Sequence, residues 1–204
     1  MYSRGGFSMT SQTEVQTAST GIPFRALEFR DVRLYIFSAA FISLDVLVPW
    51  LTHHFGGVQA GSTFLPMFFF ILLAGLLGGW RAGLLVGLFT PLVSFGVSGM
   101  PLLTVLPQIT IECLFYGLIA GLLRGKFHLK VIWALIGAMI AGRLAQLGFI
   151  TAVFLLYGGE VSPLTYMWPV VLQGLPGIAI QLTLIPLIMR IAEKWHQKRV
   201  YERC

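Results

Sequence analysis

Charged residues are scarce in this chain. Only 11% of its 204 residues are Asp, Glu, Lys or Arg, whereas soluble domains carry about 25%. Its two cysteines, Cys113 and Cys204, fall in an apolar segment and at the chain end, so we expect neither a disulfide nor a metal site. Apolar residues, by contrast, make up 56% of the chain. The composition therefore excludes an ordinary soluble domain and predicts an all-α integral protein of the cell membrane.

Six apolar segments can be drawn as alternating membrane spans. They are 32–51, 63–77, 82–95, 107–123, 131–156 and 166–191. We expect a six-helix bundle at 31–194, a disordered cytoplasmic lead at 1–30 and a basic cytoplasmic tail at 195–204. The lead lacks the continuous apolar run of a signal peptide. The segments 63–77 and 82–95 are shorter than the roughly 20 residues that a perpendicular span needs, so they must thin the bilayer or sit inside the bundle.

The positive charges fix the orientation of these spans. Thirteen of the fourteen Lys and Arg residues lie on one side of the predicted arrangement. Basic residues near span ends stay cytoplasmic, so both termini are expected inside and the segment 52–62 is expected as an outer loop. This bias also explains the net charge of +6 without a nucleic-acid partner. The exception, Arg143, lies within a span and needs an explanation of its own.

Polar residues at membrane depth are costly and usually face a partner or a cavity. Most of those present fall between the midplane and the outer surface. We predict that they form a ligand site, with Ser98–Pro101 as a gate. The predicted contacts are Asp45, Met100, Pro101, Gln108, Glu112, Arg143, Gln146, Gln173 and Gln181. One alternative is that Glu112 and Arg143 only pair with each other and hold two spans together. For Asp45, a local cap or loop anchor is the favoured alternative.

Small residues recur four positions apart, which lets helices approach closely. Packing within the bundle is the favoured interpretation, and docking to another membrane protein is the alternative. The predicted docking residues are Ala39, Ser43, Gly75, Gly79, Gly83 and Gly87.

Several short motifs follow one another over about 130 residues. Their order and spacing resemble those of the substrate-binding S components of energy-coupling factor (ECF) vitamin transporters, especially the pantothenate-type group. They are Leu65-Pro66-Met67, Leu73 to Gly78, Ser98-Gly99-Met100-Pro101, Glu112 with Tyr116-Gly117, Ala141-Gly142-Arg143, and Gly174 to Gly177 with Gln181 and Pro186. The resemblance implies a six-helix subunit that captures a vitamin outside and associates with a membrane scaffold subunit and two ATPases. It also implies an Ala-x-x-x-Ala docking motif in the first helix, to which Ala39-x-x-x-Ser43 is the nearest match.

The ligand class stays open at this level. Arg143 suits a carboxylate such as pantothenate, which we favour. Glu112 and Asp45 suit a cationic or hydrogen-bond-donating ligand such as a pyrimidine. If Glu112 neutralises Arg143, a neutral ligand is expected.

Two other functions were weighed against the residues. An intramembrane hydrolase built on Ser98 needs a histidine base within reach, and no predicted span contains a histidine. The stretch 121–126 fails the spacing of a nucleotide-binding loop. We therefore expect no catalytic residue and no cofactor. A self-contained carrier needs carboxylates accessible from both sides, and the two deep ones, Asp45 and Glu112, both lie toward the outside.

Overall fold

The computed structural model of the chain describes residues 29–64, 66–99, 101–158 and 162–201. Six helices fill this part of the chain, and no strand occurs in it. They are α2 (Val32–Phe64), α3 (Pro66–Gly78), α4 (Trp80–Ser98), α5 (Leu106–Gly125), α6 (Val131–Tyr157) and α7 (Pro163–Tyr201). Four of them, α4 to α7, are long and apolar enough to cross a membrane by length and composition. The prediction of an all-α membrane protein is confirmed.

The first helix is longer than the sequence predicted. The expected outer loop at 52–62 is wrong, because α2 continues without a break from Val32 to Phe64. No proline occurs between Pro49 and Pro66, and the glycines in this stretch only weaken a helix rather than end it. At 1.5 Å per residue, its 33 residues span about 50 Å, which exceeds the hydrocarbon thickness of about 30 Å.

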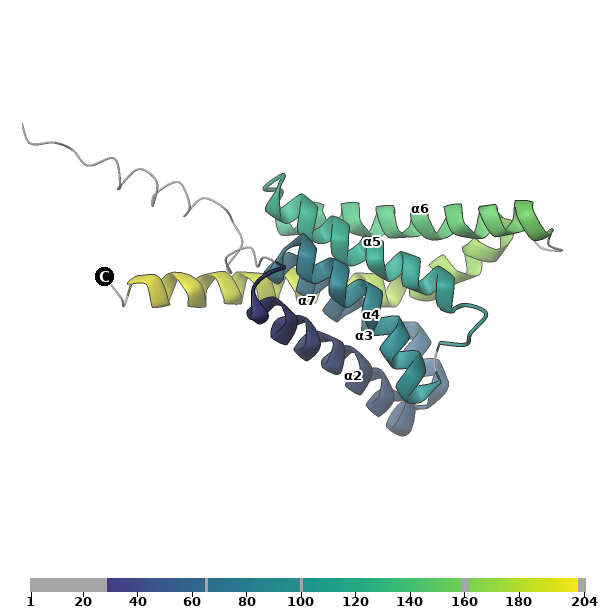
Figure 1. The fold of residues 1–204 in the computed structure, drawn as a ribbon, viewed down its shortest axis with the longest axis horizontal. Helices are drawn as coiled ribbons and strands as arrows, with labels where there is room; N and C mark the ends of the chain where they lie inside the picture. The colour runs from purple at the N-terminus through teal and green to yellow at the C-terminus, as the bar shows by residue number, and fades with distance from the viewer. Residues whose placement is uncertain (1–28, 65, 100, 159–161, 202–204) are drawn as a thin grey trace, which may run out of the picture.

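The short helix α3 forms the centre of the bundle. Nine of its 13 residues are buried, and Ile71, Leu72 and Leu76 are inaccessible to solvent. α2, α4 and α5 pack around it, as the overlapping ribbons of Figure 1 indicate. α3 therefore sits inside the bundle, one of the two outcomes expected for a span of this length. Gly79 alone separates it from α4, with φ of 82°, a left-handed conformation that glycine adopts readily.

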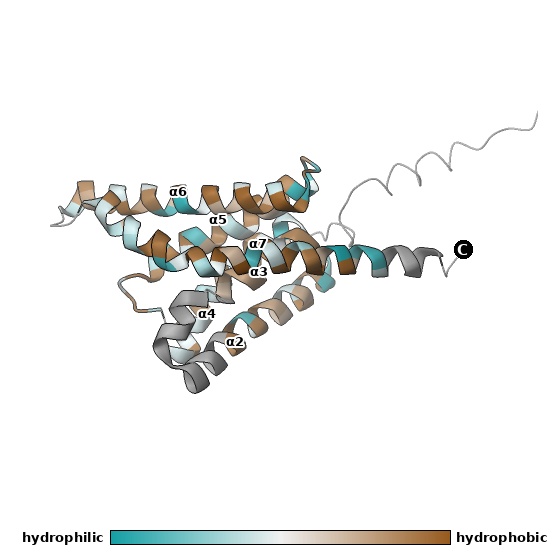
Figure 2. Cartoon of the chain, turned by 180° about the vertical axis from the view of Figure 1, so that it is seen from behind, coloured by the Kyte–Doolittle hydropathy of each residue, from teal (hydrophilic) through white to brown (hydrophobic). Residues whose placement is uncertain are grey.

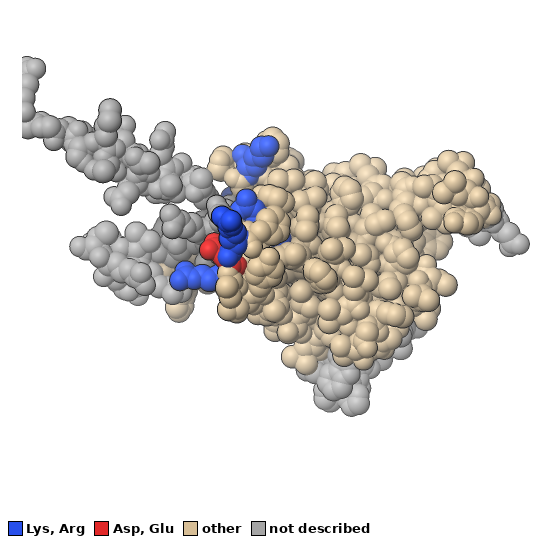
Figure 3. Space-filling view, viewed as in Figure 1, with Lys and Arg blue, Asp and Glu red and all other residues tan. Residues whose placement is uncertain are grey.

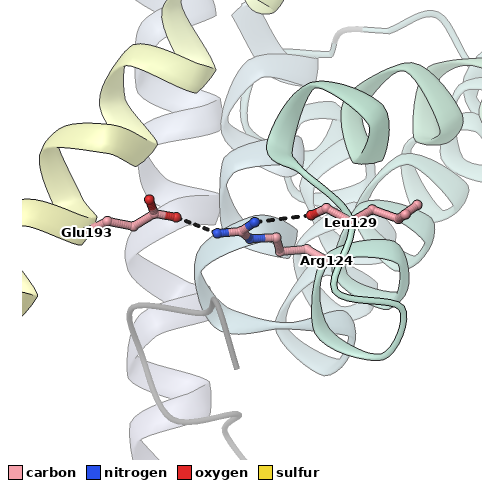
Figure 4. Close-up of polar contacts among 3 residues, drawn as sticks. All are labelled: Arg124, Leu129 and Glu193. Atoms are coloured by element: carbon pink, nitrogen blue, oxygen red, sulfur yellow. Dashed lines mark hydrogen bonds and ion pairs between the residues drawn. The ribbon is translucent and has the colours of Figure 1, made fainter. Parts of the chain in front are cut away.

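Charge gathers at one end of the molecule. Figure 3 shows the Lys, Arg, Asp and Glu side chains of the visible face at the end from which α7 projects, with uncharged surface elsewhere. Figure 2 shows the same end as the most hydrophilic part of the bundle. There Arg124, at the end of α5, is ion-paired with Glu193 of α7 and donates a hydrogen bond of 3.1 Å to the carbonyl of Leu129 (Figure 4). The positive-inside rule predicts that this end faces the cytoplasm.

The last helix extends beyond the others. α7 includes Pro169, Pro176 and Pro186 and still runs continuously from Pro163 to Tyr201. Its C-terminal part leaves the bundle at the charged end (Figure 1). Residues 195–201 of the segment predicted as a basic tail, 195–204, are therefore part of the helix α7.

Candidate functional site

An ion pair joins α5 to α6 at membrane depth. Arg143 Nη1 lies 3.1 Å from Glu112 Oε1, and the two side chains are 16% and 2% exposed. Glu112 lies on the second turn of α5, in its N-terminal half. Gly142, the residue before Arg143, lets the two helices approach, because a Cβ at this position would lie 2.2 Å from the ring of Tyr116. The fold thus brings the one deep cation of the described helices against one of their two deep carboxylates.

Two amide side chains extend the polar contacts around this pair. Gln146 lies one turn beyond Arg143, is 3% exposed, and accepts a hydrogen bond of 3.2 Å from Arg143 Nη1. Gln108 lies one turn before Glu112, and its Nε2 donates a hydrogen bond of 2.9 Å to the hydroxyl of Tyr166 on α7. We call these five residues, Gln108, Glu112, Arg143, Gln146 and Tyr166, the polar seam.

The backbones of α5 and α7 stay apart at this seam. In the described part of the chain no Cα atoms of these two helices come within 8 Å of each other, whereas α6 packs against both. The contact from Gln108 to Tyr166 therefore crosses between helices through side chains alone. Tyr166 was not predicted from the sequence as a contact residue. Its position at the start of the last span, level with Gln108, is the signal that could have found it.

Two atoms of the pair have unused hydrogen-bonding capacity. Glu112 Oε1 touches Arg143 Nη1 as a charge contact but accepts no hydrogen bond, and Arg143 Nε donates none. Both atoms are buried. Four other buried side-chain atoms of the described residues also lack a hydrogen-bond partner, but only this ion pair leaves both an acceptor and a donor unpaired. Because most buried polar groups in proteins find a partner, this pair is the place where a group from outside the chain could bind.

The other predicted contacts are spread more widely. Gln181 is 2% exposed and Gln173 is exposed, both on α7. Asp45 is fully buried on α2, where its Oδ2 accepts a hydrogen bond of 3.2 Å from Thr90 of α4. Asp45 therefore belongs to a separate contact between α2 and α4, and the sequence did not identify Thr90 as its partner. Pro101 lies in the loop between α4 and α5, and Met100 lies outside the described residues.

Three of the glycines predicted to dock a partner are used inside the bundle. A Cβ on Gly75 or Gly83 would lie 2.5 or 2.1 Å from the carbonyl oxygen of Gly117, and one on Gly87 would lie 2.4 Å from that of Cys113. α5 occupies the faces of α3 and α4 that these glycines form. The docking prediction is corrected for these positions, because no second protein can reach them while α5 is in place.

The remaining docking residues differ among themselves. Gly79 is buried at the turn before α4, and a Cβ there would meet no atom within 4 Å. Ala39 and Ser43 are exposed on α2. Ser43 donates a hydrogen bond of 2.8 Å to the carbonyl of Ala39, so its hydroxyl is already satisfied. It borders a largely apolar groove of about 440 Å³ between α2 and α4, lined also by Ile42, Val46, Leu47, Val93 and Val97.

Comparison with known proteins agrees with the helical architecture. A family model described as "ECF transporter, substrate-specific component" matches residues 34–189. The matched segment begins in α2 and ends in α7, so it includes the polar seam and the bundle core. No curated protein and no solved structure matches the chain significantly.

Proposed function

The chain belongs to the substrate-specific components of ECF transporters, and from this premise we propose that its polar seam binds the transported molecule. The family is a transport family without enzymatic activity, so a hydrolase built on Ser98 is not carried further. As an S component the chain is a membrane-embedded subunit for a small-molecule substrate. We propose that it captures a vitamin or a related molecule on the outer side and works with a membrane scaffold subunit and two ATPases.

The buried pair of Glu112 and Arg143 is the observation on which this proposal rests. Ionised side chains inside a membrane protein are costly and usually mark a substrate path. Here Arg143 of the pair donates a hydrogen bond to Gln146, Gln108 lies one turn from Glu112 on α5, and two buried atoms of the pair have no hydrogen-bond partner. It lies near the outer end of α5, away from the basic end of the molecule. Gln173 and Gln181 of α7 are proposed as further contacts, and Pro101 with Met100 as part of the gate.

The identity of the vitamin depends on how Arg143 is used. The sequence favoured pantothenate because its carboxylate would meet an arginine. Arg143 already has Glu112 as its partner at 3.1 Å, so a carboxylate ligand would have to share or replace that partner. Pantothenate is therefore the first compound to test, beside an uncharged analogue.

The ligand proposal is tested by purifying the full chain in detergent and identifying the small molecules that remain bound by mass spectrometry. Arg143→Ala is expected to lower affinity for the molecule found by about tenfold or more, roughly 1.4 kcal/mol. Because this change leaves Glu112 buried without its cation, the double variant Glu112→Gln/Arg143→Gln controls for loss of folding. Unchanged affinity in a folded variant would reject the seam as the site.

Transport by the purified chain alone in liposomes would indicate a self-contained carrier instead.

Docking to the scaffold is proposed for the exposed face of α2 around Ala39 and Ser43. Small residues let two membrane helices approach closely, so Ala39→Leu is expected to reduce recovery of the scaffold subunit in a pull-down while ligand binding is retained. Ala152→Leu, at an exposed position of α6, is the matched control. If both variants recover the scaffold equally well, this face of α2 is not the docking surface.

A further inference from the structure

Few charged side chains lie near the polar seam. Away from the charged end, the described helices contain three ionisable Asp, Glu, Lys or Arg side chains: Asp45, Glu112 and Arg143. Arg143 is paired with Glu112, and Asp45 Oδ2 accepts a hydrogen bond from Thr90 of α4. The seam itself therefore has a formal charge of zero, and this part of the molecule has no second Lys or Arg to receive an anion.

A charged ligand would have to break this pair. An anion would compete with Glu112 for the guanidinium, and a cation would compete with Arg143 for the carboxylate. Glu112 is 2% exposed, so its displaced charge would remain buried and uncompensated. Removing one partner of a buried ion pair shifts an equilibrium by roughly 100-fold or more. Binding of either kind of ion is therefore penalised relative to binding of an uncharged molecule.

The two atoms of the pair without a hydrogen-bond partner indicate which uncharged groups fit. Glu112 Oε1 can accept one hydrogen bond, and Arg143 Nε can donate one. These atoms belong to two side chains in direct contact, so a ligand that satisfies both must present a donor and an acceptor close together. An N–H beside a C=O, as in a carboxamide, a lactam or a ureide, has this arrangement. The amides of Gln108 and Gln146, each one turn from the pair along its own helix, also offer both donors and acceptors.

We propose that the molecule bound at the polar seam is uncharged at this point and presents adjacent N–H and C=O groups to the contact between Glu112 Oε1 and Arg143. This inference rests on the proposed function, because it assumes that the seam is the substrate site. It goes beyond that function by naming the ligand chemistry. It also disfavours the carboxylate end of pantothenate as the group that Arg143 receives.

The experiment compares probes that differ in charge and little else. The purified full chain is incubated with an equimolar mixture of nicotinate, nicotinamide, pantothenate and its alcohol pantothenol, and the retained molecules are quantified by mass spectrometry together with any carried over from the cells. We expect the uncharged member of a pair to be retained at least tenfold better than the carboxylate. We also expect any molecule carried over from the cells to be uncharged and to contain an amide-like edge.

Glu112→Gln supplies the sharpest comparison. It removes the negative partner and leaves Arg143 free, so the preference is expected to reverse toward the carboxylate member of each pair. Glu193→Gln removes a carboxylate at the charged end and is expected to leave the preference unchanged. If Glu112→Gln does not fold, the double variant Glu112→Gln/Arg143→Gln, which removes both charged groups, is expected to retain at least tenfold less of the uncharged member than the unmodified chain.

Each outcome bears on one of the two proposals. A tighter carboxylate in the unmodified chain, or a preference that Glu112→Gln leaves unchanged, overturns the ligand class while the capture function stands. Retention that neither seam variant alters overturns the seam as the site, and the ligand class with it. If no small molecule is retained from the mixture or from the cells, the capture function itself fails.

Discussion

Gly83 is the position at which an added methyl group is expected to lower the stability of the bundle most. It lies where α4 crosses α5, and a Cβ there would stand 2.1 Å from the carbonyl oxygen of Gly117 and 2.9 Å from the Cα of Gly75. The contact is reciprocal, since a Cβ on Gly117 would lie 2.1 Å from the carbonyl oxygen of Gly83. All these neighbours are backbone atoms, so no flexible side chain can move aside.

The size of the effect follows from these distances. Gly83→Ala must separate α4 from α5 by about 0.9 Å to reach the 3.0 Å below which Cβ contacts essentially never occur. A gap of 0.5–1 Å removes a quarter to a half of the attractive energy of each dispersion contact. The close contacts at Gly87 and Gly121 would lengthen as α4 and α5 separate. Overpacking costs about 1–3 kcal/mol, and we expect the upper end, about 3 kcal/mol, because only backbone can yield. For a chain of this length that corresponds to about 6–12 °C in Tm.

The assay is thermal unfolding of the purified protein in one detergent, followed by intrinsic tryptophan fluorescence. Gly96→Ala is the matched control, because Gly96 is in the same helix and a Cβ there would meet nothing within 4 Å. It is expected to leave Tm unchanged or raise it slightly, since alanine favours a helix over glycine. If Gly83→Ala unfolds within about 2 °C of Gly96→Ala, the backbone contact between α4 and α5 does not limit stability and the reasoning fails.

Two further predictions concern polar contacts elsewhere in the bundle. Thr90→Val should destabilise the protein by about 2 kcal/mol because it removes the hydroxyl that donates to buried Asp45, whereas Thr90→Ser should retain most of the stability; equal melting curves for the two variants would argue against this contact. Glu193→Gln should cost less than about 1 kcal/mol, since the Glu193 side chain is 36% exposed. Arg124→Ala should cost more, because it also removes the donor to Leu129; equal losses in chemical unfolding would contradict that ranking.

The fold could be predicted where one local signal dominates. Apolar length and the one-sided placement of Lys and Arg were enough for the helical membrane class, and the predicted bounds of α5 and α6 differ from the observed ones by at most two residues. The end of α2 could not be predicted in the same way. His53, His54 and two neighbouring glycines are typical of a loop, but nothing in 52–62 forces a helix to stop, so the backbone hydrogen bonds continue to Phe64.

The candidate site was predictable in part for a similar reason. Ionisable residues at membrane depth are rare, so Glu112 and Arg143 stood out, and their spacing placed Gln108 and Gln146 on the same helix faces. Which helix each face meets is a property of the packed bundle. Spacing alone could not show that Asp45 faces Thr90 on α4, that Gln108 reaches Tyr166, or that Gly83 packs against Gly117 rather than against a partner protein.

The contrast between the two kinds of helix contact indicates where a ligand enters. α3, α4 and α5 meet through glycine backbones at distances that admit no extra methyl group, so separating them would lose many contacts at once. α5 and α7 meet at the seam through side chains, with Gln108 donating to Tyr166. A single hydrogen bond contributes only about 1 kcal/mol net, and a ligand can replace it. We therefore expect α7 to move away from α5 when a ligand reaches the Glu112–Arg143 pair from outside, while α3 to α5 keep their positions.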